Sequence, residues 1–176
     1  SRYSCVTRCR RFGKSMAAKM LCAYYDKSCS SRELFRGLKA EQDSSFETYL
    51  NQYSVLYLDV TSFTARPELR RNIVRAMQEK IIKELKGAFS EIEYEDGADL
   101  MDVLSAIYHG TGERFFFIID EWDAICREFP ERQKMKGDPD TVAPTILDEY
   151  VMLLRRLFKT QDSDRVFAGA YLTGIL

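Results

Sequence analysis

The chain has 176 residues, of which 45% are hydrophobic and 30% are charged, and its net charge at pH 7 is −1. This composition predicts one ordinary globular domain with a substantial core over residues 1–176. The balanced charge gives no general reason to expect binding to nucleic acid or to a membrane, and no apolar run approaches the length that crosses a bilayer. Five cysteines without a CxxC pair predict reduced thiols in a cytoplasmic protein, and a single histidine, His109, does not favour a zinc site.

Strand-like and helix-like segments alternate along the chain. Short apolar runs predict strands over residues 3–7, 55–60, 115–120 and 166–172. The segments between them predict helices over residues 16–25, 67–89, 100–108 and 145–159. Apolar residues recur three or four apart in the last three of these, so each helix has one face for a sheet. The alternation predicts an α/β fold, a three-layer sandwich with a mainly parallel sheet and helices on both faces.

Three local features complete this outline. Residues 28–38 are expected to form a loop with a short helical turn. Residues 128–144 carry prolines and charges, which predicts a surface loop that could act as a lid or contact a partner. His109 is expected at the end of its helix, just before Gly110, where its charge suits the helix dipole.

The first candidate site is Gly13-Lys14-Ser15, which follows the first strand and opens the first helix. That context is the one a phosphate-binding P-loop requires. Backbone N–H groups at the helix N-terminus would face a polyphosphate, Lys14 would add a point charge, and Ser15 would offer a hydroxyl to Mg²⁺. The match is incomplete, because the full pattern has Gly five residues before Gly13 and this chain has Arg8. Lys14 and Ser15 could instead be the polar first turn of an amphipathic helix.

Basic residues gather around this loop. Arg8, Arg10 and Arg11 could neutralise the charge of bound phosphates. They could equally form a solvated basic face, or contact nucleic acid or an acidic partner. The cluster does not extend beyond the first twenty residues, and nucleic acid therefore stays open as a partner without being favoured.

The second candidate site is Asp120-Glu121, which ends the apolar run 115–119. Such a run predicts a strand buried on both faces of a parallel sheet, and ligands bind beyond the carboxyl ends of such strands. This is the Walker B arrangement, in which Asp120 would hold the Mg²⁺ shell and Glu121 would polarise an attacking water. The two acids could also cap a following helix. Asp123 is expected to cap that helix or to pair with a basic side chain.

Two further residues end predicted strands. Asp59 could reach the same edge of the sheet, or could be a hydrogen-bonded acid at the strand end. Thr173 ends the last strand where a sensor residue would contact a terminal phosphate or a water, although Thr is also a good strand former.

With these motifs placed, the chain resembles the bacterial AAA-ATPase-like family. The resemblance covers nearly the whole chain and rests on residues 10–15, 55–59, 118–123 and 172–176. Family members typically show an Arg-Pro-Arg-Arg-Phe-Gly-Lys-Ser/Thr loop and an Ile-Asp-Glu-Tyr-Asp motif. Here Cys9 replaces the usual Pro, and Trp122 replaces the usual Tyr. Members are commonly longer, often with a nuclease-like domain of the PD-(D/E)XK type, so this chain is expected to be part of a longer protein.

The resemblance implies a P-loop NTPase fold that binds ATP with Mg²⁺. The implied nucleotide contacts come from Arg10, Arg11, Phe12, Gly13, Lys14, Ser15 and Thr173. Ser15 and Asp120 are the implied metal ligands, and Glu121 and Lys14 the implied catalytic residues. The preference for ATP over GTP comes from the resemblance, not from the residues.

Several functions fit these sites. The leading hypothesis is Mg²⁺-dependent ATP hydrolysis that drives a switch or motor. An arginine finger could be Arg127, Arg132, Arg155 or Arg165, which in trans would imply a homo-oligomer. The alternative is a module that binds nucleotide without significant turnover. A kinase fits less well, because adjacent Asp120 and Glu121 suit water activation, and a purely structural role explains the two motifs least well.

Overall fold

The computed structural model describes residues 2–9, 11–129 and 144–175. Within these ranges, four strands form one sheet in the order β1-β4-β3-β2, and every neighbouring pair is parallel. The strands are β1 (Tyr3–Thr7), β2 (Ser54–Asp59), β3 (Phe115–Asp120) and β4 (Phe167–Gly174). The predicted parallel sheet is therefore confirmed, and each predicted strand overlaps an observed one.

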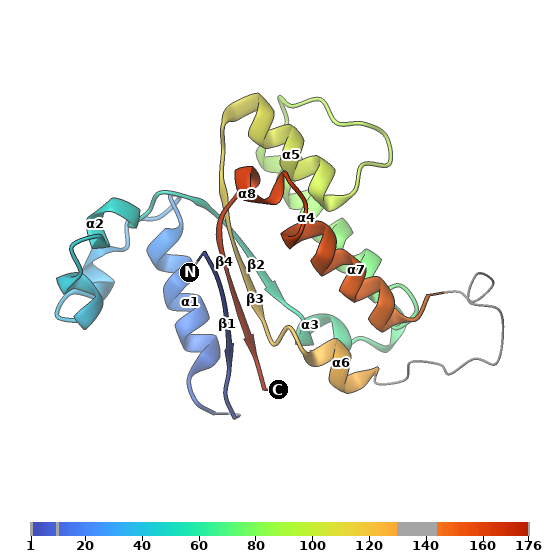
Figure 1. Ribbon diagram of the computed structural model, residues 1–176, viewed down its shortest axis with the longest axis horizontal. Coiled ribbons are helices and arrows are strands. Elements are labelled where there is room, and N and C mark those ends of the chain that lie inside the picture. Colours follow the sequence, from blue (N-terminus) through green and yellow to red (C-terminus); the bar gives the residue numbers. More distant parts are fainter. Residues whose placement is uncertain (1, 10, 130–143, 176) are drawn as a thin grey trace.

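Helices cover both faces of the sheet, which confirms the predicted three-layer sandwich. Figure 1 shows α1 on one side of the sheet and α4, α5 and α7 on the other. The bounds of these four helices are Lys14–Tyr25, Ile73–Ala88, Leu100–Thr111 and Ile146–Phe158. The shorter helices are α2 (Phe46–Tyr49), α3 (Thr61–Thr64), α6 (Ala124–Glu128) and α8 (Ser163–Val166). Three 3₁₀ turns complete the list: η1 (Arg32–Phe35), η2 (Lys39–Gln42) and η3 (Pro67–Leu69).

Some predicted boundaries were wrong. The helix expected over 67–89 is broken after η3, because Asn72 has a non-helical φ of −130° and α4 begins after it. The helix α5 continues through His109 and Gly110 to Thr111, and the left-handed φ of 75° at its C-cap, Gly112, closes the last turn. The loop expected over 128–144 lies mostly outside the described residues, so its predicted role as a lid or contact stays a prediction.

The main core lies between the sheet and the helices α4, α5 and α7. The predicted apolar face of α4 is confirmed, since its four members are at most 5% exposed: Ile73, Met77, Ile81 and Leu85. Alternate residues of β3 enter this core, namely Phe115, Phe117 and Ile119. Phe116 lies on the opposite face, where its ring stacks on Tyr25 of α1 with centroids 3.8 Å apart. Because side chains alternate along a strand, Asp120 points to the same face as Phe116, towards α1.

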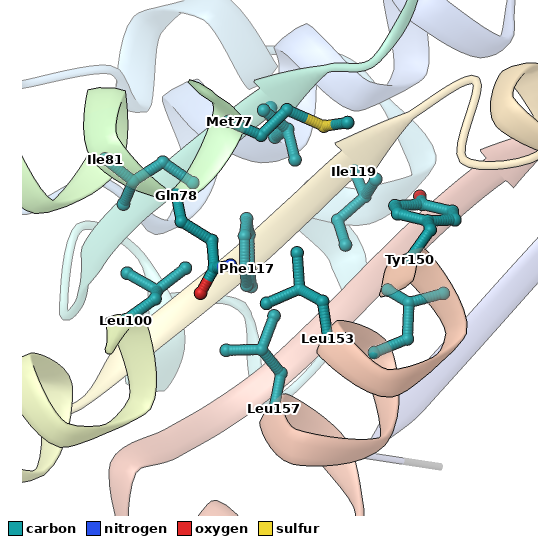
Figure 2. Close-up of a pocket in the computed structure, with 11 residues that line it drawn as sticks. Met77, Gln78, Ile81, Leu100, Phe117, Ile119, Tyr150, Leu153 and Leu157 are labelled. Carbon is teal, nitrogen blue, oxygen red and sulfur yellow. The ribbon is translucent and has the colours of Figure 1, made fainter. Parts of the chain in front are cut away.

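Figure 2 shows the centre of this core, where side chains from the helices α4, α5 and α7 meet those of β3. They enclose a cavity of only about 10 Å³. That volume is about the smallest that can hold a water, and apolar cavities stay dry. The core is therefore closely packed and provides a rigid base for the carboxyl ends of the strands.

A second, smaller apolar cluster packs against the far end of α1. It consists of Phe35, Phe46 and Leu50, with Tyr24 of α1 packed on them. The side chain of Asn51 joins this segment to α1 by donating to the carbonyls of Ala23 and Asp26, at 3.0 and 2.7 Å. The turn predicted within 28–38 is present as η1, whereas the cluster that it helps to form was not predicted.

The state of the cysteines and the character of the helices were both addressed by the composition. All five cysteines are free thiols, as their odd number and spacing predict. Among the described residues, no helix combines the length and the apolar character needed to cross a bilayer.

Candidate functional site

The segment between β1 and α1, described at residues 8–9 and 11–13, lies at the carboxyl edge of the sheet. Its start is tied to β4, because the Arg8 N–H donates to the Gly174 carbonyl at 3.2 Å. Its end is the N-cap of α1, Gly13, whose left-handed φ of 74° suits a residue without a Cβ. The first bond of α1 runs from Ala17 N to Gly13 O, at 2.9 Å. The N–H groups of the three residues before Ala17, namely Lys14, Ser15 and Met16, therefore have no acceptor within the helix, and they carry its partial positive charge.

Lys14 lies inside this loop and is only 7% exposed. Its Nζ donates to the carbonyl oxygens of Arg8 and Cys9, at 3.0 and 3.1 Å. The same nitrogen is 3.8 Å from Oε1 of Glu121. The loop therefore wraps around the ammonium group and brings it next to the residue that follows β3.

The carboxylate of Asp120 is buried between two hydroxyl groups from the neighbouring strands. Tyr57 of β2 donates to Oδ2 at 3.1 Å, and Thr173 of β4 donates to Oδ1. Burial and the nearby Asp120 carboxylate raise the pKa of Tyr57, so its hydroxyl stays protonated and remains a donor. Asp120 is 3% exposed, and Thr173 is fully buried. Its neighbours thus fix the orientation of this carboxylate.

Glu121 begins the turn of residues 121–123 that follows β3 immediately. Its φ of 54° is left-handed, which is uncommon for a residue other than Gly. The turn is held to β4 by two bonds, from Glu121 N to Thr173 Oγ1 at 3.1 Å and from Trp122 N to Thr173 O at 2.9 Å. Its side chain faces two cations, because Oε2 also lies 2.9 Å from Nη2 of Arg127.

Arg127 of α6 also pairs with Asp123 through Nη1, which confirms the predicted pairing of Asp123 with a basic side chain. The side chain of Asp123 is buried, and Oδ2 accepts from Ile175 N at 3.0 Å. Burial favours the neutral acid, but the bonds from Arg127 and Ile175 outweigh it and hold the pKa of Asp123 below its usual value. Asp123 therefore anchors Arg127 as a charged group.

An open cleft of about 470 Å³ lies beside Lys14, Glu121 and Arg127. Its lining consists of Arg11, Gly13, Lys14, Ser15, Met16, Thr61, Glu121 and Arg127. Five of the predicted site residues are in this list: Arg11, Gly13, Lys14, Ser15 and Glu121. Asp120 and Thr173 lie in the buried network beside the cleft. The cleft thus combines the N-terminus of a helix, three cationic side chains and one carboxylate.

The remaining predicted nucleotide contacts and arginine fingers either do not line the cleft or lie outside the described residues. The side chain of Phe12 is 71% exposed, and Arg10 lies outside the described residues, as does Arg132. Arg155 and Arg165 are exposed residues of α7 and α8 that do not line the cleft. Of the proposed arginine fingers in the described ranges, only Arg127 lines it.

Three contacts were not anticipated from the sequence. Tyr57 bonds to Asp120, Thr61 lines the cleft, and Arg127 pairs with Glu121. Asp59 accepts from the N–H and hydroxyl of Thr61, at 3.0 and 2.6 Å, which agrees with the reading of Asp59 as a hydrogen-bonded residue at a strand end. For Arg127, the sequence carried a signal only for its ion pair with Asp123, since these two residues are four apart.

The fold and the cleft define a class of protein, the α/β sandwiches of the P-loop NTPase type. The chain belongs to the AAA-ATPase-like family, described as a predicted AAA-ATPase, whose pattern it matches over residues 1–176. No curated protein and no solved structure matches the chain significantly. The family match agrees with the resemblance found in the motifs.

Proposed function

We propose that the cleft binds ATP with Mg²⁺ and that the domain hydrolyses it. The observation that carries this proposal is the approach of Lys14 Nζ to Glu121 Oε1, at 3.8 Å, beside the N-terminus of α1. A phosphate-binding cation and a carboxylate able to orient water thereby share one cleft. Its volume of about 470 Å³ lies in the range of ligand pockets, roughly 300–1,000 Å³.

In this proposal the phosphates occupy the N-terminus of α1. The N–H groups of Gly13, Lys14 and Ser15 would donate to phosphate oxygens, and the side chains of Lys14 and Arg11 would neutralise their charge. Arg10, which lies outside the described residues, is included in the same proposed contacts. Phe12 would contribute its backbone only, because the residue is 71% exposed and does not line the cleft. Lys14 would also stabilise charge that develops during hydrolysis.

The residues present fit a Mg²⁺ ion. Among the described residues no cluster of three or more His, Cys, Asp or Glu could form a metal site by itself. Mg²⁺ does not need such a cluster, since it keeps several waters and binds through one or two carboxylates and the substrate's phosphates. Ser15 and Asp120 would supply the protein oxygens, because each carboxylate oxygen of Asp120 has a second lone pair beyond its bond to Tyr57 or Thr173. The ion would neutralise phosphate charge.

Glu121 would orient the attacking water, with Thr173 holding both Glu121 and Asp120 in place. The second candidate is a module that binds nucleotide without turnover. Its supporting observation is the ion pair between Glu121 and Arg127, which occupies the carboxylate. Substitution of Glu121 by Gln separates the two. In an ATPase this substitution should slow hydrolysis by about 10²–10⁴-fold while ATP stays bound. In a binding module it should change neither the affinity for nucleotide nor the low rate of turnover.

The deciding experiment is a calorimetric titration of ATP and ADP, with and without Mg²⁺. The parent chain should bind both, and Lys14→Ala should weaken ATP binding by at least about 100-fold, since it removes a buried cation with several charge-assisted bonds. Lys19→Ala is the matched control, because Lys19 is an exposed lysine of the same helix that does not line the cleft. Equal binding by the parent and Lys14→Ala would refute the phosphate site.

A further inference from the structure

Arg127 lies between two carboxylates that have different freedom to move. Its Nη1 pairs with Asp123, which is fully buried and also fixed by Ile175 N. Its Nη2 pairs with Glu121 at 2.9 Å, and Glu121 lines the cleft with 19% of its side chain exposed. Asp123 is therefore a fixed anchor for the guanidinium group, whereas Glu121 is a partner that can leave.

Each of the two carboxylate oxygens of Glu121 faces a cation. Oε1 faces Lys14 Nζ at 3.8 Å, and Oε2 faces Arg127 Nη2 at 2.9 Å. Each oxygen of Glu121 keeps a second lone pair, but the two cations draw its negative charge away, so it accepts from a water more weakly than an unpaired carboxylate would. Release of one of these cations would strengthen Glu121 as an acceptor. Both cations line the same cleft, so an anion entering the cleft meets the groups that hold Glu121.

We propose that Arg127 senses the terminal phosphate of the bound nucleotide. Without that phosphate, its guanidinium group holds Glu121; with it, the same Nη2 edge bonds to phosphate oxygens, and Glu121 becomes free to accept from water. The exchange is favoured because a planar guanidinium group suits phosphate as well as carboxylate, and a terminal phosphate carries more charge than Glu121. Asp123 keeps the arginine at the cleft throughout. This inference rests on the proposed function of the cleft as an ATP site.

A sensor of the terminal phosphate has a signature that a structural ion pair lacks. It contributes to the binding of ATP and not to that of ADP. Loss of one charge-assisted contact should weaken ATP binding by about 10–100-fold, whereas ADP binding should change by less than about threefold. The measured quantity is the ratio of the Kd values for ADP and ATP, each titrated in the presence of Mg²⁺ into the parent and into Arg127→Gln.

Two further variants keep this test decisive. Arg127→Lys retains a charge without the planar group and should restore part of the ratio. Because Arg127→Gln leaves Asp123 buried without its cation, the double variant Asp123→Asn/Arg127→Gln removes both charges and carries the test if the single variant unfolds. Arg156→Gln is the matched control, since Arg156 pairs with Asp99 and Asp102 away from the cleft.

The outcomes separate the two proposals. A ratio that falls about tenfold or more in Arg127→Gln or in the double variant, and stays at the parent value in Arg156→Gln, supports the sensor. A parent that binds ATP and loses it in Lys14→Ala, but whose Arg127 variants keep the parent ratio, overturns the sensor and leaves the nucleotide site intact. A parent that binds neither nucleotide overturns both.

Discussion

At the scale of single residues, Thr173 connects three consecutive residues, Asp120, Glu121 and Trp122, to β4. Its hydroxyl donates to Asp120 and accepts from the N–H of Glu121, and its carbonyl accepts from Trp122 N. One buried side chain therefore orients the acid at the end of β3 and the backbone of the next residue. These bonds stabilise the left-handed backbone of Glu121, which is strained for a residue with a Cβ.

Replacing Thr173 by Val tests that role. The change keeps the branched shape and removes the hydroxyl, which leaves the Oδ1 of Asp120 and the N–H of Glu121 without this partner. We expect the free energy of unfolding to fall by about 1–3 kcal/mol, as measured by urea denaturation. Thr173→Ser keeps the hydroxyl and should lose about 0.8 kcal/mol for one methyl group. A Val variant that is as stable as the Ser variant would contradict the network.

At the scale of elements, β4 connects the parts of the site because it lies between β1 and β3. Its last residues bind the loop after β1, through Arg8 N and Gly174 O, and the turn after β3, through Thr173. Gly174 also faces the side chains of that turn. A Cβ at this position would lie 2.8 Å from Nε1 of Trp122 and 2.9 Å from Oδ1 of Asp123.

We therefore expect Gly174→Ala to displace Trp122 and Asp123 and to reduce the free energy of unfolding by about 1–3 kcal/mol. Trp122 is the only tryptophan in the chain, so its fluorescence reports the displacement directly. Gly87→Ala is the control, because a Cβ there meets no atom within 4 Å, and α4 should gain about 0.5–1 kcal/mol. Unchanged fluorescence and stability in Gly174→Ala would show that the turn has room to adjust.

The helices and strands with the strongest local sequence patterns are those that the sequence predicts. The apolar run of β3 and the helical periodicity of α4, α5 and α7 are strong local signals, so these elements and their buried faces were predicted well. Lys14 and Glu121 were placed at the same edge because strands of a parallel sheet end together. The ion pair of Arg127 with Glu121 was not predicted, since it depends on the left-handed turn at Glu121, which no residue type there signals.

At the scale of the whole molecule, local sequence patterns predict neither the order of the strands nor the division of the apolar residues into two clusters. Periodicity predicts which face of a strand is buried, but not which strand is its neighbour, so the order β1-β4-β3-β2 comes only from the structure. The same is true of the division of apolar residues into two clusters. The main core includes Tyr150 of α7, and the small cluster includes Phe35, Phe46 and Leu50 beside Tyr24 of α1.

The two tyrosines allow one chemical change to test both clusters. The ring of Tyr150 lies in the main core, as Figure 2 shows, and its hydroxyl is buried without a hydrogen-bond partner among the described residues. Tyr24 instead donates to the carbonyl of Phe46 at 2.7 Å, and burial raises its pKa to about 12, so the hydroxyl stays a donor.

Removal of an unpaired buried hydroxyl relieves a desolvation cost, whereas removal of a paired one leaves its acceptor unsatisfied. We therefore expect Tyr150→Phe to leave the free energy of unfolding unchanged or to raise it by up to about 1–3 kcal/mol. Tyr24→Phe should lower it by about 1 kcal/mol. Urea denaturation of both variants compares the two signs directly. A loss of stability in Tyr150→Phe as large as that in Tyr24→Phe would mean that the hydroxyl of Tyr150 is bonded in solution, and that the main core contains a water or a polar group at this position.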